Sequence, residues 1–238
     1  MRHFLKLTAA SLIAGLAFHG TAHAQKTFSA ASHEYASEAQ SLQAANDHKK
    51  AIKRLKKGLK LDGLTPFEAS TMNQMLGTSY YTRGENKKAI EAFQNAINAG
   101  GLSRTDQTNL KVNVAQLNIV EENYALGAQQ LEAYFQEGGV QKTKLVKMVM
   151  QAHIRGKNKD AAVPWAEVML QQGQIQTRKD HELAIYLFDS PEKRASQMRV
   201  ANQFYAKWPQ DPKVLTQIAR LNVKAKIDGV APVVVAGQ

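Results

Sequence analysis

The chain contains no cysteine in its 238 residues. This absence excludes a disulfide scaffold, a zinc site built from thiolates and a thiol nucleophile. It also excludes a lipid attached to cysteine behind an export signal, so the chain is not expected to be a lipoprotein. Proline is scarce, with six residues that lie largely at breaks between apolar-periodic segments. Proline therefore marks the ends of segments.

Long apolar runs are also missing beyond the N-terminus. The first six residues are basic, with Arg2, Lys6 and no acid; residues 7–18 are largely apolar; and an A-x-A site ends at Ala24. This pattern is typical of a secretory signal peptide, residues 1–24, cleaved after Ala24. The run is too short for a transmembrane anchor, which needs about 20 residues. We therefore predict a soluble protein exported to the bacterial periplasm, with no transmembrane segment in the mature chain.

Acidic residues are fewer than basic ones: the chain has 31 Lys and Arg and 20 Asp and Glu, which gives a formal net charge of +11. Removal of the signal takes away Arg2 and Lys6 and leaves +9. Such a balance favours acidic partners or anionic surfaces without identifying one. Export makes a nucleic-acid partner unexpected.

No arrangement of residues typical of catalysis is present. His33, His48, His153 and His181 are scattered without the spacing of metal ligands. Residues 84–88 lack the preceding strand and the Gly-Lys-Ser/Thr ending of a phosphate loop. We therefore predict a protein that is not an enzyme, with no catalytic residues, no metal and no cofactor.

Apolar residues recur mainly every three or four positions, and no segment shows sustained strand alternation. Breaks rich in Gly, Asn and Asp separate segments of about 12 to 18 residues, which are ordinary helix lengths. The pattern predicts α-helical hairpins in series.

These segments repeat one another. Residues 86–93 (NKKAIEAF) match residues 48–55 (HKKAIKRL), which places Ala51 on Ala89, 38 residues later; Gly127 lies another 38 residues on. Two antiparallel helices approach closely only where a small residue admits the partner, and large residues fill the surrounding volume. The residues predicted to pack the repeats are Ala39, Ala51, Gly77, Tyr80, Ala89, Phe93, Ala96, Ala115, Gly127 and Ala161.

One copy carries a recognisable signature, formed by Leu76, Gly77, Tyr80, Gly84, Ala89, Phe93 and Ala96. This set resembles the tetratricopeptide repeat (TPR), although Asn73 replaces the usual Trp and Gly101 the usual closing Pro. The resemblance implies an all-α fold, a right-handed α-solenoid of antiparallel helical hairpins with about four to five repeats and a capping helix. It also implies a concave face that binds peptides or proteins, and no catalytic activity.

The predicted domain organisation follows from this resemblance. A helical repeat domain covers residues 25–228, with clear copies at 32–175 and a degenerate repeat and cap at 176–228. Residues 229–238, with Gly, Pro and a Val triplet, are predicted to form a flexible tail.

In this family the first helix of each hairpin lines the concave groove. Stripes at i, i+4, i+7 point away from the packing side, and here they are uncharged. Their amides can hydrogen-bond an extended backbone, and their apolar members can receive apolar side chains. The alternative is that they are ordinary helix surface. The predicted groove residues are Gln40, Gln43, Gln74, Thr78, Tyr81, Val112, Gln116, Ile119, Met150 and His153.

A second surface lies on a basic amphipathic segment, residues 49–60, which contains no acid. One interpretation is contact with anionic lipid, an acidic polymer or an acidic protein. The other is the solvated outer face of a second helix. The candidate residues are Lys49, Lys50, Lys53, Arg54, Lys56, Lys57 and Lys60.

The function predicted from these features is a non-catalytic periplasmic scaffold or adaptor that binds a protein or peptide in its groove. Similar exported repeat proteins accompany envelope machinery, which implies a place in an energy-transduction or transport assembly. The alternative is a peripheral module that holds anionic envelope lipid or polymer through residues 49–60.

Overall fold

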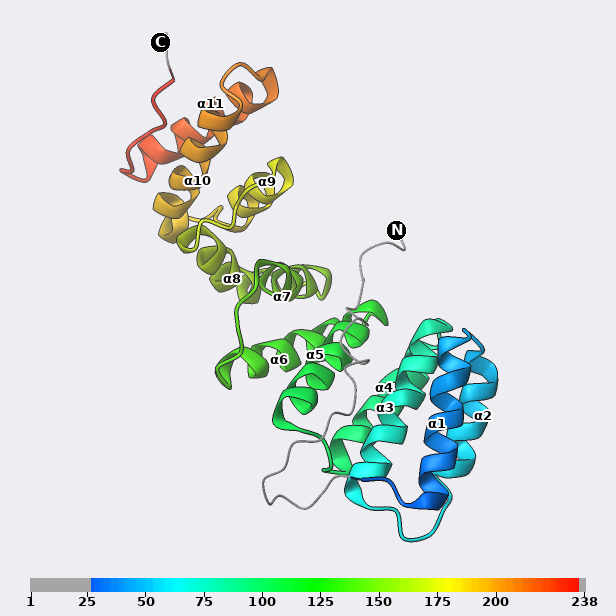
Figure 1. The fold of residues 1–238 in the computed structure, drawn as a ribbon. Coiled ribbons are helices and arrows are strands. Elements are labelled where there is room, and N and C mark those ends of the chain that lie inside the picture. The colour runs from blue at the N-terminus through cyan, green and yellow to red at the C-terminus, as the bar shows by residue number, and fades with distance from the viewer. Residues whose placement is uncertain (1–26, 236–238) are drawn as a thin grey trace, which may run out of the picture. The chain divides into compact units, whose positions relative to one another are not determined.

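The computed structural model describes residues 27–235, so the predicted signal peptide lies outside the described residues. The described part contains eleven α-helices and one short 3₁₀ segment, and no strand (Figure 1). The all-α prediction is therefore confirmed. The bounds are α1 Ala30–Ala44, α2 His48–Gly58, α3 Pro66–Thr82, α4 Asn86–Asn98, α5 Arg104–Val120, α6 Tyr124–Gln136, α7 Thr143–Arg155, α8 Lys159–Gln171, α9 Arg178–Leu187, η2 Pro191–Lys193, α10 Arg194–Lys207 and α11 Pro212–Ile227.

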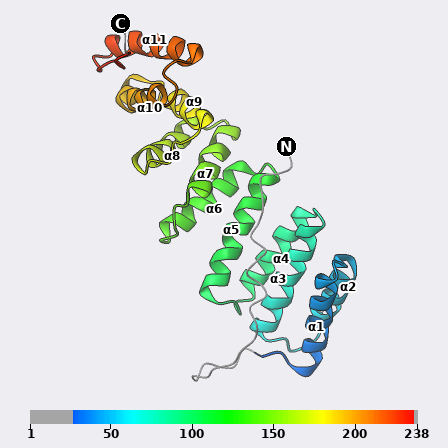
Figure 2. The same cartoon turned by 45° about the horizontal axis from the view of Figure 1, so that its top comes forward.

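The chain divides into two compact units between Asn123 and Tyr124. In unit 1, which holds α1 to α5, each helix packs on the next along the chain. In unit 2 the same holds from α6 to α11 (Figures 1 and 2). Each unit is thus a stack of consecutive helices, and the division falls inside the third predicted copy.

Short turns set the start of each second helix. Four residues with left-handed φ, between 59° and 75°, lie two positions before α2, α4, α6 and α8; they are Asn46, Gly84, Glu122 and Lys157. Such a conformation stops one helix and redirects the chain into the next. Because the turn is the same in every case, it provides a common register for the four hairpins.

This register moves one predicted packing residue. Five positions after the turn residue lie Ala51, Ala89, Gly127 and Ala162, and all four are buried. Ala162 is 0% exposed, whereas Ala161 is half-buried in the first turn of α8. The spacing from Gly127 is therefore 35 residues, and Ala162 takes the packing position that the sequence comparison assigned to Ala161.

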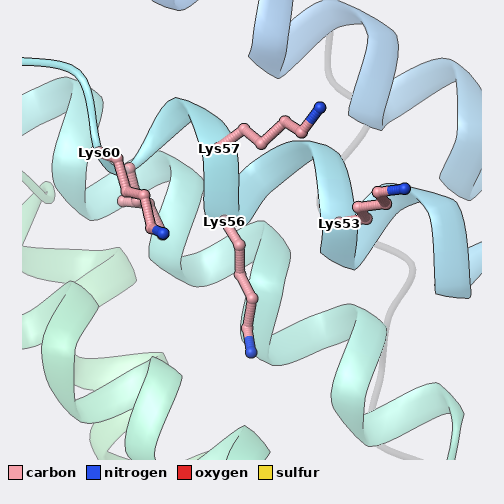
Figure 3. Close-up of a pocket in the computed structure, with 5 residues that line it drawn as sticks. Lys53, Lys56, Lys57 and Lys60 are labelled. Carbon is pink, nitrogen blue, oxygen red and sulfur yellow. The ribbon is translucent and has the colours of Figure 1, made fainter.

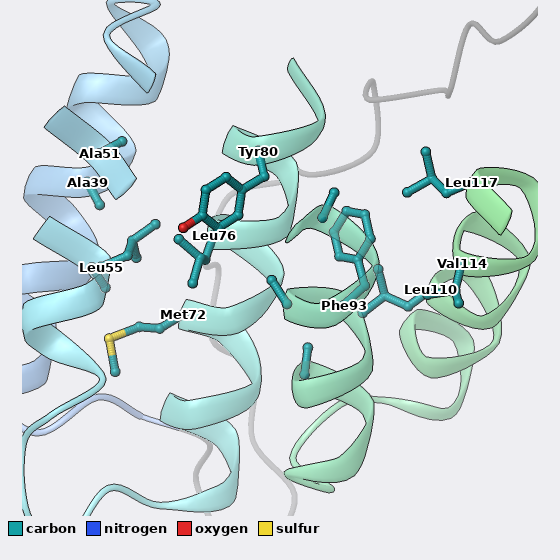
Figure 4. Close-up of a cluster of buried hydrophobic side chains, with 14 residues drawn as sticks. Ala39, Ala51, Leu55, Met72, Leu76, Tyr80, Phe93, Leu110, Val114 and Leu117 are labelled. Atoms are coloured by element: carbon teal, nitrogen blue, oxygen red, sulfur yellow. The ribbon is translucent and has the colours of Figure 1, made fainter. Parts of the chain in front are cut away.

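The core of unit 1 shows why the small residues recur (Figure 4). A Cβ built on Gly77 of α3 lies 2.4 Å from Cδ1 of Phe93 on α4, so only glycine admits the ring. Most of the predicted packing residues are buried within unit 1: Ala39, Ala51, Tyr80, Ala89, Phe93, Ala96 and Ala115 are each at most 5% exposed. Small and large side chains thus alternate across the helix pairs.

The Gly77–Phe93 contact yields a test of the packing. Gly77→Ala is expected to destabilise the protein by about 1–3 kcal/mol, because a methyl group forces the Phe93 ring out of place. Phe93→Ala removes Cγ, Cδ1 and Cε1, the atoms that clash, so Gly77→Ala is expected to cost less in that background. A double-mutant cycle of unfolding free energies measures this coupling. Equal costs of Gly77→Ala in the two backgrounds would contradict the explanation.

The chain after α11 is held rather than free. Asn222 of α11 donates through Nδ2 to the carbonyl of Val233 (2.9 Å). Its Oδ1 accepts from the backbone N–H of Val233 (2.8 Å). Val233 is only 2% exposed. The described part of the segment predicted as a flexible tail is therefore fixed to α11, because one amide side chain pairs with both backbone groups of a buried valine.

Candidate functional site

The predicted groove residues of unit 1 lie on α1, α3 and α5, the first helices of their hairpins. We call them the first-helix surface: Gln40, Gln43, Gln74, Thr78, Tyr81, Val112, Gln116 and Ile119. Gln40 is exposed and Gln116 is buried, at 7% exposure, while the other six are half-buried. Most of these side chains therefore retain some access to solvent.

Two members of this surface already serve the fold. Gln43 donates through Nε2 to the carbonyl of Met75 and to Oγ of Ser79, both at 2.7 Å, and so ties α1 to α3. Thr78 donates its hydroxyl to the carbonyl of Gln74 (3.0 Å) within α3. The side-chain amides of Gln40 and Gln74 form no hydrogen bond with the described part of the chain, so they are available to a ligand.

The part of the first-helix surface that α3 contributes carries little charge. Among the residues of α3, Glu68 is the only one with a formal charge at neutral pH, and it is 1% exposed. Amides and hydroxyls therefore occupy the accessible side of this helix, in a chain of which 21% of residues are charged. Such a surface suits neutral hydrogen-bonding groups better than ions.

In unit 2 the predicted groove residues fall in a different environment. Met150 of α7 is 3% exposed. It lies twelve residues before Ala162, just as the buried Gly77 lies twelve residues before Ala89, so Met150 and Gly77 are at equivalent positions. Met150 therefore occupies the inward packing position. The residues equivalent to Gln74, Thr78 and Tyr81 are Lys147, Gln151 and Ile154, each one position after the predicted stripe.

His153 is likewise engaged inside unit 2. Its Nε2 lies 2.7 Å from Oε1 of Glu132 on α6, and the indole N–H of Trp165 on α8 donates to the same oxygen at 2.9 Å. Trp165 also packs against Phe135, with ring centroids 5.3 Å apart. One carboxylate thus joins three helices. Sequence reasoning missed this cluster because its members are 21 and 33 residues apart.

The basic segment forms α2, and its cations are unequally neutralised. Arg54 pairs with Glu34 and Glu38 of α1, both at 2.6 Å, and lies 4.0 Å from the centroid of the Tyr35 ring. Lys50 pairs with Asp47 at 2.8 Å, and this hydrogen bond raises the pKa of Lys50. The Arg54 contacts position α2 against α1, whereas the Lys50–Asp47 pair lies at the N-terminus of α2 itself.

The remaining lysines near the end of α2 have no such partners. Lys53, Lys56, Lys57 and Lys60 form no ion pair with the residues that the structure describes. Together with Leu59 they line an open hollow of about 530 Å³ (Figure 3). We call these four residues and the space between them the lysine hollow. It is the part of the basic segment with the largest uncompensated positive charge.

The histidines do not assemble into a metal site. No group of three or more potential His, Asp or Glu ligands gathers in residues 27–235. His181 is fully buried, with Nδ1 2.8 Å from the carbonyl of Thr177 and its ring stacked on Phe204. Burial lowers the pKa of His181. Its place is in the core of unit 2.

A helix that crosses a bilayer must be both long and apolar. None of the described helices combines the two to the degree that crossing a bilayer requires.

Comparison with known proteins identifies the fold. No protein-family model matches the chain, and no curated protein matches its sequence. Among solved structures, the chain is similar to YrrB, a TPR protein with an unusual peptide-binding site, at 18% identity and a TM-score of 0.53, over 77% of this chain and 89% of YrrB. It is also similar to a TPR protein from Parabacteroides merdae, at 14% identity and a TM-score of 0.54, over 84% of this chain and 78% of that one. The TPR-like fold predicted from the sequence is confirmed.

Proposed function

We propose that this TPR-like chain is a non-catalytic scaffold or adaptor that binds a protein or an extended peptide on its first-helix surface. TPR-like folds commonly serve protein interactions, although a fold alone does not supply a function. The observation that carries the proposal is the uncharged first-helix surface, where the amides of Gln40 and Gln74 have no partner in the described chain. The peptide-binding site named for YrrB supports the same kind of function by analogy.

The proposed mode of binding follows from the chemistry of these side chains. A carboxamide both donates and accepts, so it pairs with the N–H and C=O groups of an extended backbone. Tyr81, Val112 and Ile119 are half-buried and offer apolar contact beside the amides. The expected ligand is therefore an extended segment with few charges, recognised through its backbone and a few apolar side chains.

A crosslinking experiment tests the proposal. A photoreactive residue placed at Gln74 on α3 is expected to capture a partner in cells, whereas the same residue at Gln94, exposed on the second helix α4, is not. Mass spectrometry identifies the partner, which is then purified. Capture of the same proteins from both positions, or from neither, would count against the first-helix surface.

Affinity for the purified partner gives the quantitative prediction. Gln40→Ala combined with Gln74→Ala is expected to weaken binding by about 1–3 kcal/mol, which is roughly a five- to 150-fold rise in Kd, because partner groups are left unpaired. The matched control is Gln129→Ala with Gln136→Ala, two exposed glutamines of α6. Isothermal titration calorimetry of both variants measures the difference. An equal loss in the control would contradict the assignment.

The proposed location is the periplasm, in an envelope energy-transduction or transport assembly. It is supported by the basic and apolar N-terminal residues and the A-x-A site that ends at Ala24. The intact mass of the protein from a periplasmic extract tests it, since a mature chain should begin at Gln25. A chain that keeps Met1 in the cytoplasmic fraction would overturn this part of the proposal.

A second candidate function is attraction to an anionic envelope surface or polymer through α2. It is favoured by one observation, the four lysines of the lysine hollow that no described acid neutralises. Such attraction needs only local positive charge and falls steeply with added salt.

A further inference from the structure

The lysine hollow differs from the rest of α2 in how its charge is disposed. Lys53, Lys56 and Lys57 are spaced i, i+3 and i+4, so they start from an arc of about 100° on one side of α2, and Lys60 follows in the turn after the helix. In Figure 3, Lys56 and Lys60 extend to one side of α2 and Lys57 to the other. Leu59 is the one apolar residue that also lines the hollow. The ammonium groups are thus spread around the end of α2 instead of forming a line.

Helix stability does not account for all four lysines. Cations near a helix C-terminus are favoured by the macrodipole, which explains Lys56 and Lys57 in the last turn of α2. Lys53 lies a turn earlier and Lys60 lies beyond the helix end. Like charges three and four residues apart repel one another, and no described acid relieves these pairs. Lysines that repel one another without compensation in the folded chain point to a ligand of opposite charge.

The geometry also indicates the kind of anion. An ammonium group presents three donors as a compact point charge, which suits phosphate oxygens. Lys56 is further oriented by the Tyr80 ring, whose centroid lies 5.7 Å from its Nζ. The four lysines line one hollow from different positions along the chain. A ligand with two or more linked anionic groups can therefore meet more of them at once than one small ion can.

We infer that the lysine hollow is a specific binding site for a ligand that carries at least two closely spaced phosphate groups. This inference rests on the second candidate function and narrows it from general surface attraction to one site. The shared chemistry is the clustered phosphate, which a soluble polyphosphate or the headgroup of a lipid with two phosphates provides.

Binding of inorganic tripolyphosphate to the full mature chain is the first test. Calorimetric titration is expected to give saturable binding that weakens at least about tenfold when Lys53, Lys56, Lys57 and Lys60 are all changed to Gln. The matched control changes four exposed lysines of unit 2 to Gln, with the same loss of net charge, and is expected to bind within about twofold of the unchanged chain. The control positions are Lys144, Lys179, Lys213 and Lys226.

Folding is checked on the same samples. The fourfold variant is expected to melt close to the temperature of the unchanged chain, because the removal of four repulsive pairs offsets the lost macrodipole interaction of Lys56 and Lys57. Tripolyphosphate is expected to raise the melting temperature of the unchanged chain and not of the variant. If the fourfold variant does not fold, Lys56→Gln with Lys60→Gln provides the smaller change, with Lys213→Gln and Lys226→Gln as its control.

Vesicles distinguish the two sources of phosphate. Phosphatidylcholine vesicles with cardiolipin, which has two phosphates, are compared with vesicles carrying the same charge as phosphatidylglycerol. Hollow-dependent binding to cardiolipin vesicles and to tripolyphosphate supports a headgroup ligand; hollow-dependent binding to tripolyphosphate alone supports a soluble one. No binding to either probe, or equal losses in the fourfold variant and its control, overturns the inference. Equal binding to both vesicle types that the fourfold variant loses also overturns the specific site, while general attraction through α2 would stand.

Discussion

Arg194→Ala is expected to destabilise unit 2 by about 2–4 kcal/mol, because it removes the cation that two carboxylates share. Arg194 begins α10 and is 5% exposed. Its guanidinium pairs with Asp228, which caps α11, at 2.6 Å, and with Asp189, just after α9, at 3.0 Å. Partial exposure of both acids allows some rehydration, which keeps the expected loss below that of a fully buried pair.

The loss is expected to be local. Each helix of a stack contacts mainly its neighbours, so α9 to α11 lose protection before α1 to α5 do. Amide hydrogen exchange followed by mass spectrometry measures this, and faster exchange confined to residues 178–227 is the expected pattern. The double variant Arg194→Ala with Asp228→Asn is compared with Arg194→Ala alone. It also removes the Asp228 carboxylate that Arg194→Ala leaves unpaired, so it should recover part of the stability. A uniform rise in exchange across both units would contradict this account.

The stabilisation by this network is also expected to depend on pH. The hydrogen bond from Lys224 lowers the pKa of Asp189 to about 2; burial opposes this and Arg194 assists it. Because the folded pKa is depressed, the contribution of Asp189 is present above its ordinary value near 3.8 and is lost as the pH falls towards 2. The effect of Arg194→Ala is therefore expected to shrink over this interval.

Glu68→Gln is expected to lower the stability of unit 1 by about 2–3 kcal/mol. Glu68 is 1% exposed and its carboxylate serves two helix N-termini at once. One oxygen accepts the backbone N–H of Ser29 at 2.7 Å and the hydroxyl of Ser32, and the other accepts the N–H of Thr65 at 2.7 Å. An amide offers a single accepting oxygen, so Gln leaves one backbone N–H facing another donor.

The pH dependence of this effect follows from the pKa of Glu68. Burial alone raises that pKa, but the hydrogen bonds from Ser32, Ser29 and Thr65 outweigh it and lower it from 4.5 to about 2. The stabilisation, about 3 kcal/mol at most, is therefore complete above pH 4.5 and is lost as the pH falls towards 2.

Denaturant unfolding of the Glu68→Gln variant and the unchanged chain, at several pH values between 2 and 7, provides the measurement. The two unfolding free energies are expected to converge in acid. Glu91→Gln, at an exposed position of α4, is the control and is expected to change stability by less than about 0.5 kcal/mol. A difference between Glu68→Gln and the unchanged chain that persists at pH 2 would show that packing, and not charge, explains the loss.

Much of the fold could be predicted from contiguous residues. The three- and four-residue spacing of apolar positions predicted helices, and the repeated HKKAI and NKKAI segments placed Ala51 and Ala89 at equivalent positions. These signals are local, because helix hydrogen bonds and caps join residues only a few positions apart. The Thr65-x-x-Glu68 capping box is also readable in this way, although its reach to Ser29 is not.

The candidate sites were predicted less completely. On α3, Gln74, Thr78 and Tyr81 keep partial exposure, as the stripe required. On α7 a register error of one residue assigned Met150 and His153 to the surface, while Lys147, Gln151 and Ile154 occupy those positions. One residue rotates a helical side chain by about 100°, so a single insertion between repeats exchanges an inward residue for an outward one.

The sequence by itself determined the helices, their order and the small residues that let them pair, because these depend on neighbours along the chain. Only the tertiary structure decided which partner each charged group finds: Arg54 pairs with Glu34, Glu68 accepts the N–H of Ser29 and Arg194 pairs with Asp228, at separations of 20 to 39 residues. Among residues 27–235, it also left the lysine hollow without an acidic partner. The physical reason is that such partners are set by the rotation of each helix against the next, and a shift of one residue in a turn changes that rotation.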